Sequence, residues 1–284
     1  MITPMNVTVV IPCYNEAPEN LTEAVASVPK DPGTEVIVVD DGSTRRRTLE
    51  VLHSLDVKVI HQVNAGVAAA RNTGIAAGTG RYVLPLDSDD WLRPGFLEPL
   101  VRHMDNHDSA IATTACQCFG HKQERLVPPA IVTASQMASK CDILNTSLFR
   151  RSDWEDLGGY DETLWKGFED WEWWTRLLLH TGSTARRVDG PEYMYRVSEY
   201  GRNHTNYAGI DALITTRKAM IRNNPDFVDH LLDGLLNDIR LAYEQGQNQS
   251  PIADEATRQA QYWARRYGKL EGLRSRLTFL HNRT

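Results

Sequence analysis

Short apolar runs alternate with helical segments through the first hundred residues, and this alternation restricts the possible folds more than any other feature of the chain. Runs of strand length occupy residues 7–11, 36–39, 57–61 and 82–86. Helices are expected between them, near residues 20–28, 48–55 and 64–78. Strands and helices that alternate at this pace are typical of βαβ units. We therefore predict an α/β fold in which a mixed, mostly parallel sheet carries helices on both faces.

The pattern changes after about residue 105. Further strands are expected at 110–118 and 143–150, and the chain reads as helical from residue 208 onward. One apolar stripe there has the spacing of a helix face and consists of Phe227, Val228, Leu231, Leu232, Leu235, Leu236 and Ile239. We expect an α/β domain over residues 1–205 and a helical C-terminal region over residues 206–284.

The composition excludes several classes of protein. The 284 residues carry 31 Lys and Arg against 37 Asp and Glu, and this net charge of -6 argues against a dedicated nucleic-acid binder. Hydrophobic residues make up 41%, too many for a disordered chain, yet no run approaches the roughly 20 apolar residues that span a bilayer. No signal-peptide pattern is visible, and 4 cysteines in a chain of this length do not form a disulfide scaffold. We expect a cytoplasmic protein.

Acidic residues collect where two of the predicted strands end. Asp40 and Asp41 follow the second strand, and Asp87, Asp89 and Asp90 follow the fourth. The carboxyl ends of parallel strands meet at one edge of a sheet, where open α/β folds bind their ligands. Carboxylates packed together repel one another unless a cation or protons intervene. A hard divalent ion, completed by water and substrate phosphates, meets that need.

Turn formation is the competing explanation for both clusters, because Asp and Gly are common turn residues. For Asp40 and Asp41, which precede Gly42, the two explanations have equal weight. For residues 87–90, three carboxylates within four residues after a buried strand are costly without a ligand, which favours a binding site.

Five motifs together resemble one enzyme family. They are residues 9–16 (VVIPCYNE), 38–44 (VVDDGST), 64–72 (NAGVAAARN), 86–90 (LDSDD) and 169–170 (ED). Their order and spacing are similar to those of the family 2 inverting glycosyltransferases with the GT-A fold, the Rossmann-like fold of nucleotide-diphospho-sugar transferases. The resemblance covers roughly residues 6–200, and it is specific because five separate motifs agree.

The resemblance implies a role for each matching residue. The positions that match nucleotide contacts are Pro12, Tyr14, Glu16, Asp41, Arg71, Asp87 and Ser88. Among them, Tyr14 and Asp41 would hold the base, and Asp87 would lie toward the ribose. Asp89, with His204 from a later segment, would hold the cofactor, Mn²⁺ or Mg²⁺. Asp170 would be the catalytic base.

The implied reaction transfers a sugar from a nucleotide-diphosphate sugar, most often a UDP-sugar in this family, to an acceptor hydroxyl by direct displacement. The acceptor class stays open: a sugar, a lipid-linked glycan, a small molecule or a protein. Two other functions stay open as alternatives, namely a catalytically silent nucleotide-sugar-binding or assembly subunit and a sugar-phosphate nucleotidyltransferase. The second alternative would need a Gly-rich loop after the first strand, where this chain has PCYNE.

Five of the seven tryptophans fall within 21 positions that bracket Asp170. Sugar rings stack on aromatic planes, but large aromatic side chains also fill protein cores, and the two explanations have equal weight. Glu169 and Trp171, on either side of the expected base, are the candidate acceptor or sugar contacts. A helix N-terminus, which favours acidic side chains, is the alternative explanation for residues 169–170.

The stretch from residue 251 onward carries seven basic and three acidic side chains, a net charge of +4, beside a leucine stripe at 270–280. This pattern fits peripheral contact with an anionic membrane surface or with a lipid-linked acceptor. The explanation with more weight is a helix that packs its leucines on the catalytic domain or on a second copy of the chain, forming a homo-oligomer.

Overall fold

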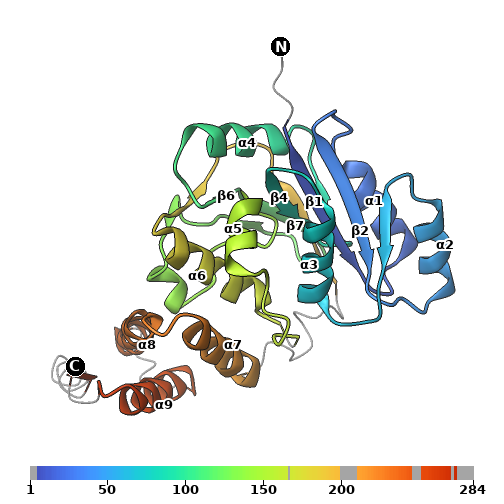
Figure 1. Cartoon of the computed structure of the whole chain (residues 1–284). Helices are drawn as coiled ribbons and strands as arrows, with labels where there is room; N and C mark the ends of the chain where they lie inside the picture. The colour runs from blue at the N-terminus through green and yellow to red at the C-terminus, as the bar shows by residue number, and fades with distance from the viewer. Residues whose placement is uncertain (1–4, 166, 199–209, 245–250, 270–271, 274–284) are drawn as a thin grey trace.

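The computed structural model describes residues 5–165, 167–198, 210–244, 251–269 and 272–273 (Figure 1). Eight strands form the main sheet in the order β3-β2-β1-β4-β10-β6-β11-β9. Their bounds are β1 Val7–Cys13, β2 Thr34–Asp40, β3 Lys58–His61, β4 Tyr82–Pro85, β6 Ile111–Thr113, β9 Ile131–Val132, β10 Leu148–Arg150 and β11 Ala185–Arg187. Strands β3, β2, β1 and β4 are parallel, as are β6 and β11, whereas β10 and β9 run antiparallel to their neighbours. The predicted mixed, mostly parallel sheet is confirmed.

Helices cover both faces of this sheet, as predicted. Their bounds are α1 Pro18–Ser27, α2 Arg46–Ser54, α3 Val67–Ala77, α4 Leu97–Asn106, α5 Arg151–Leu157 and α6 Glu169–Thr181. Because successive strand residues point to opposite faces, the neighbours Val9 and Val10 of β1 lie in two different buried clusters. The cluster of Val9 includes residues of α1, α2 and α4, and that of Val10 includes residues of α3 and α6.

A smaller sheet has the strand order β5-β12-β7-β8. Its strands are β5 Trp91–Leu92, β7 Cys116–Gly120, β8 Arg125–Leu126 and β12 Tyr193–Val197. The single strand predicted at 110–118 was wrong, because β6 lies in the main sheet and β7 in the smaller one. The chain leaves one sheet for the other at Thr114 and Ala115, where Thr114 Oγ1 donates to the Ala115 carbonyl at 2.8 Å. The strand predicted at 143–150 is limited to β10, since Ser147 Oγ bonds back to the Leu144 carbonyl at 2.6 Å.

The C-terminal region is helical, as predicted, and consists of α7 Ile210–Asn223, α8 Phe227–Glu244 and α9 Pro251–Arg266 (Figure 1). The apolar stripe of α8 is buried and belongs to the same cluster as Trp173 and Leu177 of α6. The proposed division at residue 205 therefore separates two segments that share one core. Within the described part of the chain, no helix combines the length and the apolar character needed to cross a membrane.

Candidate functional site

The segments that follow β1, β2 and β4 meet at one edge of the main sheet, because the three strands are parallel neighbours. Cys13 at the end of β1 pairs with Asp40 at the end of β2, and the Asp41 N–H donates to the Cys13 carbonyl at 2.8 Å. On the other side, the Leu86 N–H donates to the Val10 carbonyl at 2.9 Å. The three acidic or polar segments identified in the sequence therefore lie side by side.

The residues after β1 divide into buried and exposed ones. Pro12 is buried within the strand, whereas Tyr14 is 54% exposed and offers its ring at the sheet edge. Glu16 holds the start of α1, because its Oε1 accepts from the Ala17 N–H and from Asn20 Nδ2, both at 2.8 Å. Of these three predicted nucleotide contacts, Tyr14 is the one with a large accessible surface.

Asp41 organises the loop that leads into α3. Its Oδ1 accepts from Gln62 Nε2 and from the Ala65 N–H at 2.8 Å, and its Oδ2 accepts from the Gly66 N–H at 2.9 Å. Gly66 has a φ of 94°, a conformation that glycine adopts without steric cost. The buried Asp41 carboxylate thus fixes this loop, and its predicted contact with the nucleotide base stays a proposal.

The segment after β4 concentrates negative charge. Ser88 and Asp90 are buried, and Asp87 and Asp89 are partly exposed. Asp90 Oδ1 accepts from the Arg196 N–H at 2.8 Å, and Arg196 Nε donates to the Asp89 carbonyl at 2.9 Å. Burial raises the pKa of Asp90 well above its usual value, and the charges of Asp89 and Asp87 raise it further. This segment therefore carries an excess of carboxylate that a cation would offset.

Arg71 of α3 joins the segment after β4 to the start of α6. The side chain is buried, and its Nη2 donates to Asp87 Oδ1 at 2.9 Å while its Nη1 donates to Glu169 Oε1 at 2.7 Å. Burial alone would lower the pKa of Arg71, but the carboxylates of Asp87 and Glu169 raise it far above its ordinary value. Its guanidinium also lies 5.6 Å from the centre of the Tyr160 ring. Residues 71, 87 and 169, far apart in the sequence, thus form one ionic unit.

Asp170 lies in the first turn of α6, directly after Glu169. Its Oδ1 accepts from the Trp171 N–H at 2.8 Å. Burial raises the pKa of Asp170 to about 7, the charge of Glu169 acts in the same direction, and Arg71 opposes both. A carboxyl group with a pKa near neutrality is well suited to exchange protons with a substrate hydroxyl.

The tryptophans around Asp170 belong mostly to the core. Trp171 is 4% exposed, its Nε1 donates to the Met137 carbonyl at 2.6 Å, and the Arg217 guanidinium lies 5.9 Å from its ring centre. The expectation that Trp171 offers a sugar platform is therefore corrected, because its ring packs inside the protein. The exposed indole of the group is that of Trp165, which is 62% exposed and whose Cβ lies beside Gly66.

The predicted metal ligands are only partly described. Asp89 lies at the sheet edge, whereas His204 falls outside the described residues. Among the residues that the structure describes, no group of three or more His, Cys, Asp or Glu side chains could hold a metal ion by itself. A divalent ion at Asp89 would thus need oxygen ligands from the substrate, as Mg²⁺ commonly does.

Asparagine side chains complete the site, and the sequence interpretation did not include them. Asn145 Nδ2 donates to Asp87 Oδ1 at 3.1 Å, while its buried Oδ1 has no partner among the described residues. Asn72 Oδ1 accepts from Trp154 Nε1 at 3.0 Å and from the Tyr160 N–H at 2.8 Å. Asn72 is the last residue of the 64–72 motif, and this position could have identified it as a candidate. Nothing in the local sequence identifies Asn145.

Comparisons with known proteins identify the family and the fold. The model of the family described as Glycosyl transferase family 2 matches residues 8–152. A *Bradyrhizobium elkanii* protein named N-acetylglucosaminyltransferase is 33% identical over 116 residues, which cover 38% of this chain and 64% of that protein. The match therefore spans less than two thirds of that relative.

Solved structures of *Staphylococcus aureus* TarS share the fold. The complex of TarS 1–349 with UDP-GlcNAc has a TM-score of 0.63 at 20% identity and covers 95% of this chain and 90% of that chain. The structure of TarS 1–349 alone has a TM-score of 0.58 at 21% identity and covers 90% of each chain. The architecture is thus of the GT-A type, and the family match covers half of the sequence. The chain belongs to glycosyl transferase family 2.

Proposed function

We propose that the protein is an inverting glycosyltransferase that moves a sugar from a UDP-sugar to an acceptor hydroxyl by direct displacement. The observation that carries this proposal is the bridge formed by Arg71, which holds Asp87 and Glu169 on one guanidinium. The bridge joins the segment after β4, where a nucleotide diphosphate is expected, to the turn that carries Asp170. TarS, whose fold is similar, has been solved in complex with UDP-GlcNAc, and the B. elkanii relative is named an N-acetylglucosaminyltransferase. UDP-GlcNAc is therefore the first donor to test.

In the proposed reaction, the acceptor oxygen forms a bond to the anomeric carbon as its proton moves to the Asp170 carboxylate. The bond between that carbon and the diphosphate breaks, and the diphosphate leaves with the electron pair. Attack from the face opposite to the leaving group inverts the configuration. The raised pKa of Asp170 supports this role, because a base that holds protons near neutral pH can both accept and release one.

The donor set after β4 fits Mn²⁺ or Mg²⁺. Asp87, Asp89 and Asp90 supply hard oxygen atoms, and burial raises the pKa of Asp90, with the charges of Asp89 and Asp87 acting in the same direction. Asp89 would hold the ion, together with His204 if that residue reaches it. When bound, the ion supplies charge neutralisation to the leaving diphosphate.

The direct test is a screen for UDP release from UDP-GlcNAc and other nucleotide sugars, with Mn²⁺ or Mg²⁺, followed by chromatography. We expect metal-stimulated release from at least one UDP-sugar. If calorimetry detects tight nucleotide binding but no donor is consumed with any acceptor class, the catalytically silent alternative replaces the enzyme.

Replacement of Asp89 by Asn should weaken UDP binding at least tenfold when Mn²⁺ is present, because Asp89 would be the carboxylate that holds the ion. Without Mn²⁺ the same variant should bind UDP about as weakly as the natural protein does. Isothermal calorimetry with and without Mn²⁺ measures both values, and Asp31→Asn, in an exposed turn, is the matched control. Equal UDP affinity of the natural protein with and without Mn²⁺ would remove the metal from the proposal.

The rate of transfer should depend on pH through Asp170. Below a midpoint near 7 the carboxyl group is protonated and cannot act as a base, so kcat/KM should fall about tenfold per pH unit and level off above it. This midpoint belongs to the interacting pair Glu169 and Asp170. Because the charge of Glu169 helps to raise the pKa of Asp170, Glu169→Gln should move the midpoint to lower pH. A flat profile between pH 5 and 8 at constant metal occupancy would contradict the assignment.

A further inference from the structure

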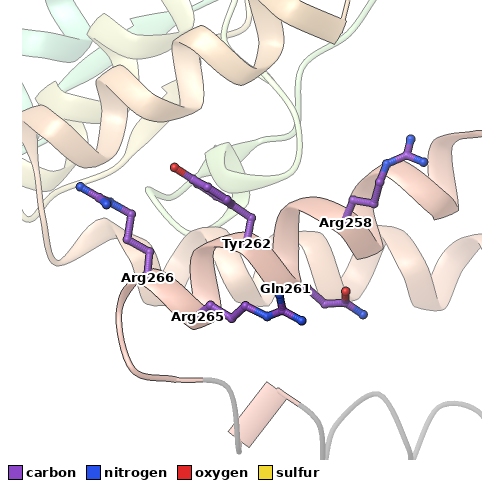
Figure 2. Close-up of a pocket in the computed structure, with 5 residues that line it drawn as sticks. All are labelled: Arg258, Gln261, Tyr262, Arg265 and Arg266. Atoms are coloured by element: carbon purple, nitrogen blue, oxygen red, sulfur yellow. The ribbon is translucent and has the colours of Figure 1, made fainter.

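Helix α9 uses its two faces differently. Ala256, Ala260, Trp263 and Ala264 are buried in the cluster that also contains the apolar stripe of α8. The opposite face borders a shallow hollow of about 470 Å³, which is lined by Arg258, Gln261, Tyr262, Arg265 and Arg266 (Figure 2). Most of the leucine stripe at 270–280 lies outside the described residues, and its packing stays a prediction, whereas α9 itself leaves a polar face turned outward.

This outward face, which we name the α9 basic face, concentrates positive charge on a protein whose net charge is -6. Residues 251–269 contain Arg258, Arg265, Arg266 and Lys269, whereas the acidic side chains Asp254 and Glu255 stand near the start of α9. Lys269 forms an ion pair with Asp229 at 2.6 Å, and Arg258, Arg265 and Arg266 line the hollow. Tyr262 is 50% exposed and lies between Arg258 and Arg266 along the helix (Figure 2).

The arginines are distributed along the helix and do not converge on one point. Arg266 lies eight positions after Arg258, which is about 12 Å along the axis of an α-helix. A compact anion would engage one end of such a row, whereas a surface that bears many phosphate groups would engage all of it. The exposed tyrosine adds an amphipathic ring of the kind enriched where proteins meet the lipid headgroup region.

We infer that the α9 basic face docks the protein on an anionic lipid surface. The attachment is electrostatic, because the apolar face of α9 is used in the protein core and cannot insert into the bilayer. In Figure 1, α9 and the carboxyl ends of β1 and β2 both lie toward the lower side of the molecule. Docking through α9 would thus turn the sheet edge that carries the candidate site toward the membrane.

Sedimentation of the full chain with lipid vesicles tests the inference without any nucleotide sugar. The probes are phosphatidylcholine vesicles and vesicles with about 30% phosphatidylglycerol, at low and at high salt. The natural protein should partition at least tenfold more strongly onto the anionic vesicles, and 0.5 M NaCl should abolish the difference because it screens exposed charges. Equal partitioning onto the two kinds of vesicle would overturn the inference.

Two double variants distinguish an effect of the α9 basic face from an effect of the protein's overall charge on partitioning. Arg265→Gln combined with Arg266→Gln should lower partitioning at least tenfold, since each arginine near an anionic surface is worth roughly fivefold. The matched control combines Arg46→Gln with Arg47→Gln, which removes the same charge from two exposed arginines of α2. If the control pair loses as much partitioning as the α9 pair, the face is not a docking site.

Two further measurements complete the test. Thermal unfolding of the α9 pair should match that of the natural protein, which shows that lost partitioning is not lost folding. If 5 mM inorganic phosphate displaces the protein from the anionic vesicles at constant ionic strength, the face binds soluble phosphate and the lipid assignment fails. UDP release measured in solution is independent of these results, so failure of docking and failure of the proposed transferase activity are distinguishable.

Discussion

Asp170→Asn is expected to lower the transfer rate by about 10³-fold, the size of effect typical of losing a general base. In the natural protein, Asp170 Oδ1 accepts a hydrogen bond from the Trp171 N–H at 2.8 Å. The amide of Asn has nearly the shape of the carboxyl group and can still accept this bond. It cannot take a proton from the acceptor hydroxyl. UDP affinity in the presence of Mn²⁺ should stay within about threefold of the natural value, because the proposed metal and nucleotide contacts lie elsewhere.

The Asp170→Asn variant should be at least as stable as the natural protein at pH 8, whereas a substitution that disrupts the fold would lower its stability. The pKa of Asp170 is about 7 in the folded protein against an ordinary value of 3.8, so the folded state loses stability as the pH rises from about 4 to 7, and the full cost is present above pH 7. At pH 8 the natural protein bears that cost and the Asn variant does not. Its Tm at pH 8 should therefore equal or exceed that of the natural protein, and the difference should shrink toward pH 5.

Single-turnover transfer assays and thermal unfolding at the two pH values measure both effects. Asp156→Asn on α5, whose side chain is 68% exposed, is the matched control and should leave the rate and the Tm unchanged. Near-normal turnover of Asp170→Asn would place the base elsewhere, and Glu169→Gln would then be the next variant to assay.

The sheet and its functional edge were predictable because they depend on local patterns. The four parallel strands follow apolar runs, and the order of strands and helices alone brings the residues after β1, β2 and β4 to one edge. The turn explanation and the binding-site explanation had equal weight for Asp40 and Asp41, and the hydrogen bonds of the two residues differ. Asp40 Oδ1 accepts from the Ser43 N–H at 2.9 Å as a turn residue does, whereas Asp41 shapes a loop more than 20 residues away.

Burial was the part that the sequence could not supply. Arg71 stands in an alanine-rich helix, and its partners Asp87 and Glu169 are 16 and 98 positions away, so no local pattern shows that the three meet. The tryptophans illustrate the same limit. Trp173 is fully buried and Trp165 is 62% exposed, although both belong to one aromatic cluster in the sequence. Helix periodicity was no guide to Trp165, which lies before α6 begins.

Arg71→Met should destabilise the protein by about 3–5 kcal/mol, the usual cost of removing one partner from a buried ionic group. Arg71 is 3% exposed, and its loss leaves the carboxylates of Asp87 and Glu169 without their shared cation. Urea unfolding measures the loss. Arg81→Met is the matched control, because the ion pair of Arg81 with Asp105 is exposed and such pairs contribute about 1 kcal/mol or less.

Arg71→Met should also move the midpoint of the pH profile of transfer to higher pH. Arg71 lowers the pKa of Asp170, and without it the neighbouring negative charges raise that pKa further. Combining Arg71→Met with Glu169→Gln removes the cation and one of the two carboxylates together. The double variant should therefore be more stable than Arg71→Met alone, and the difference gives the coupling between the two residues. If the two losses of stability simply add, the bridge between α3 and α6 does not hold these segments together, and the observation that carries the proposed function loses its physical basis.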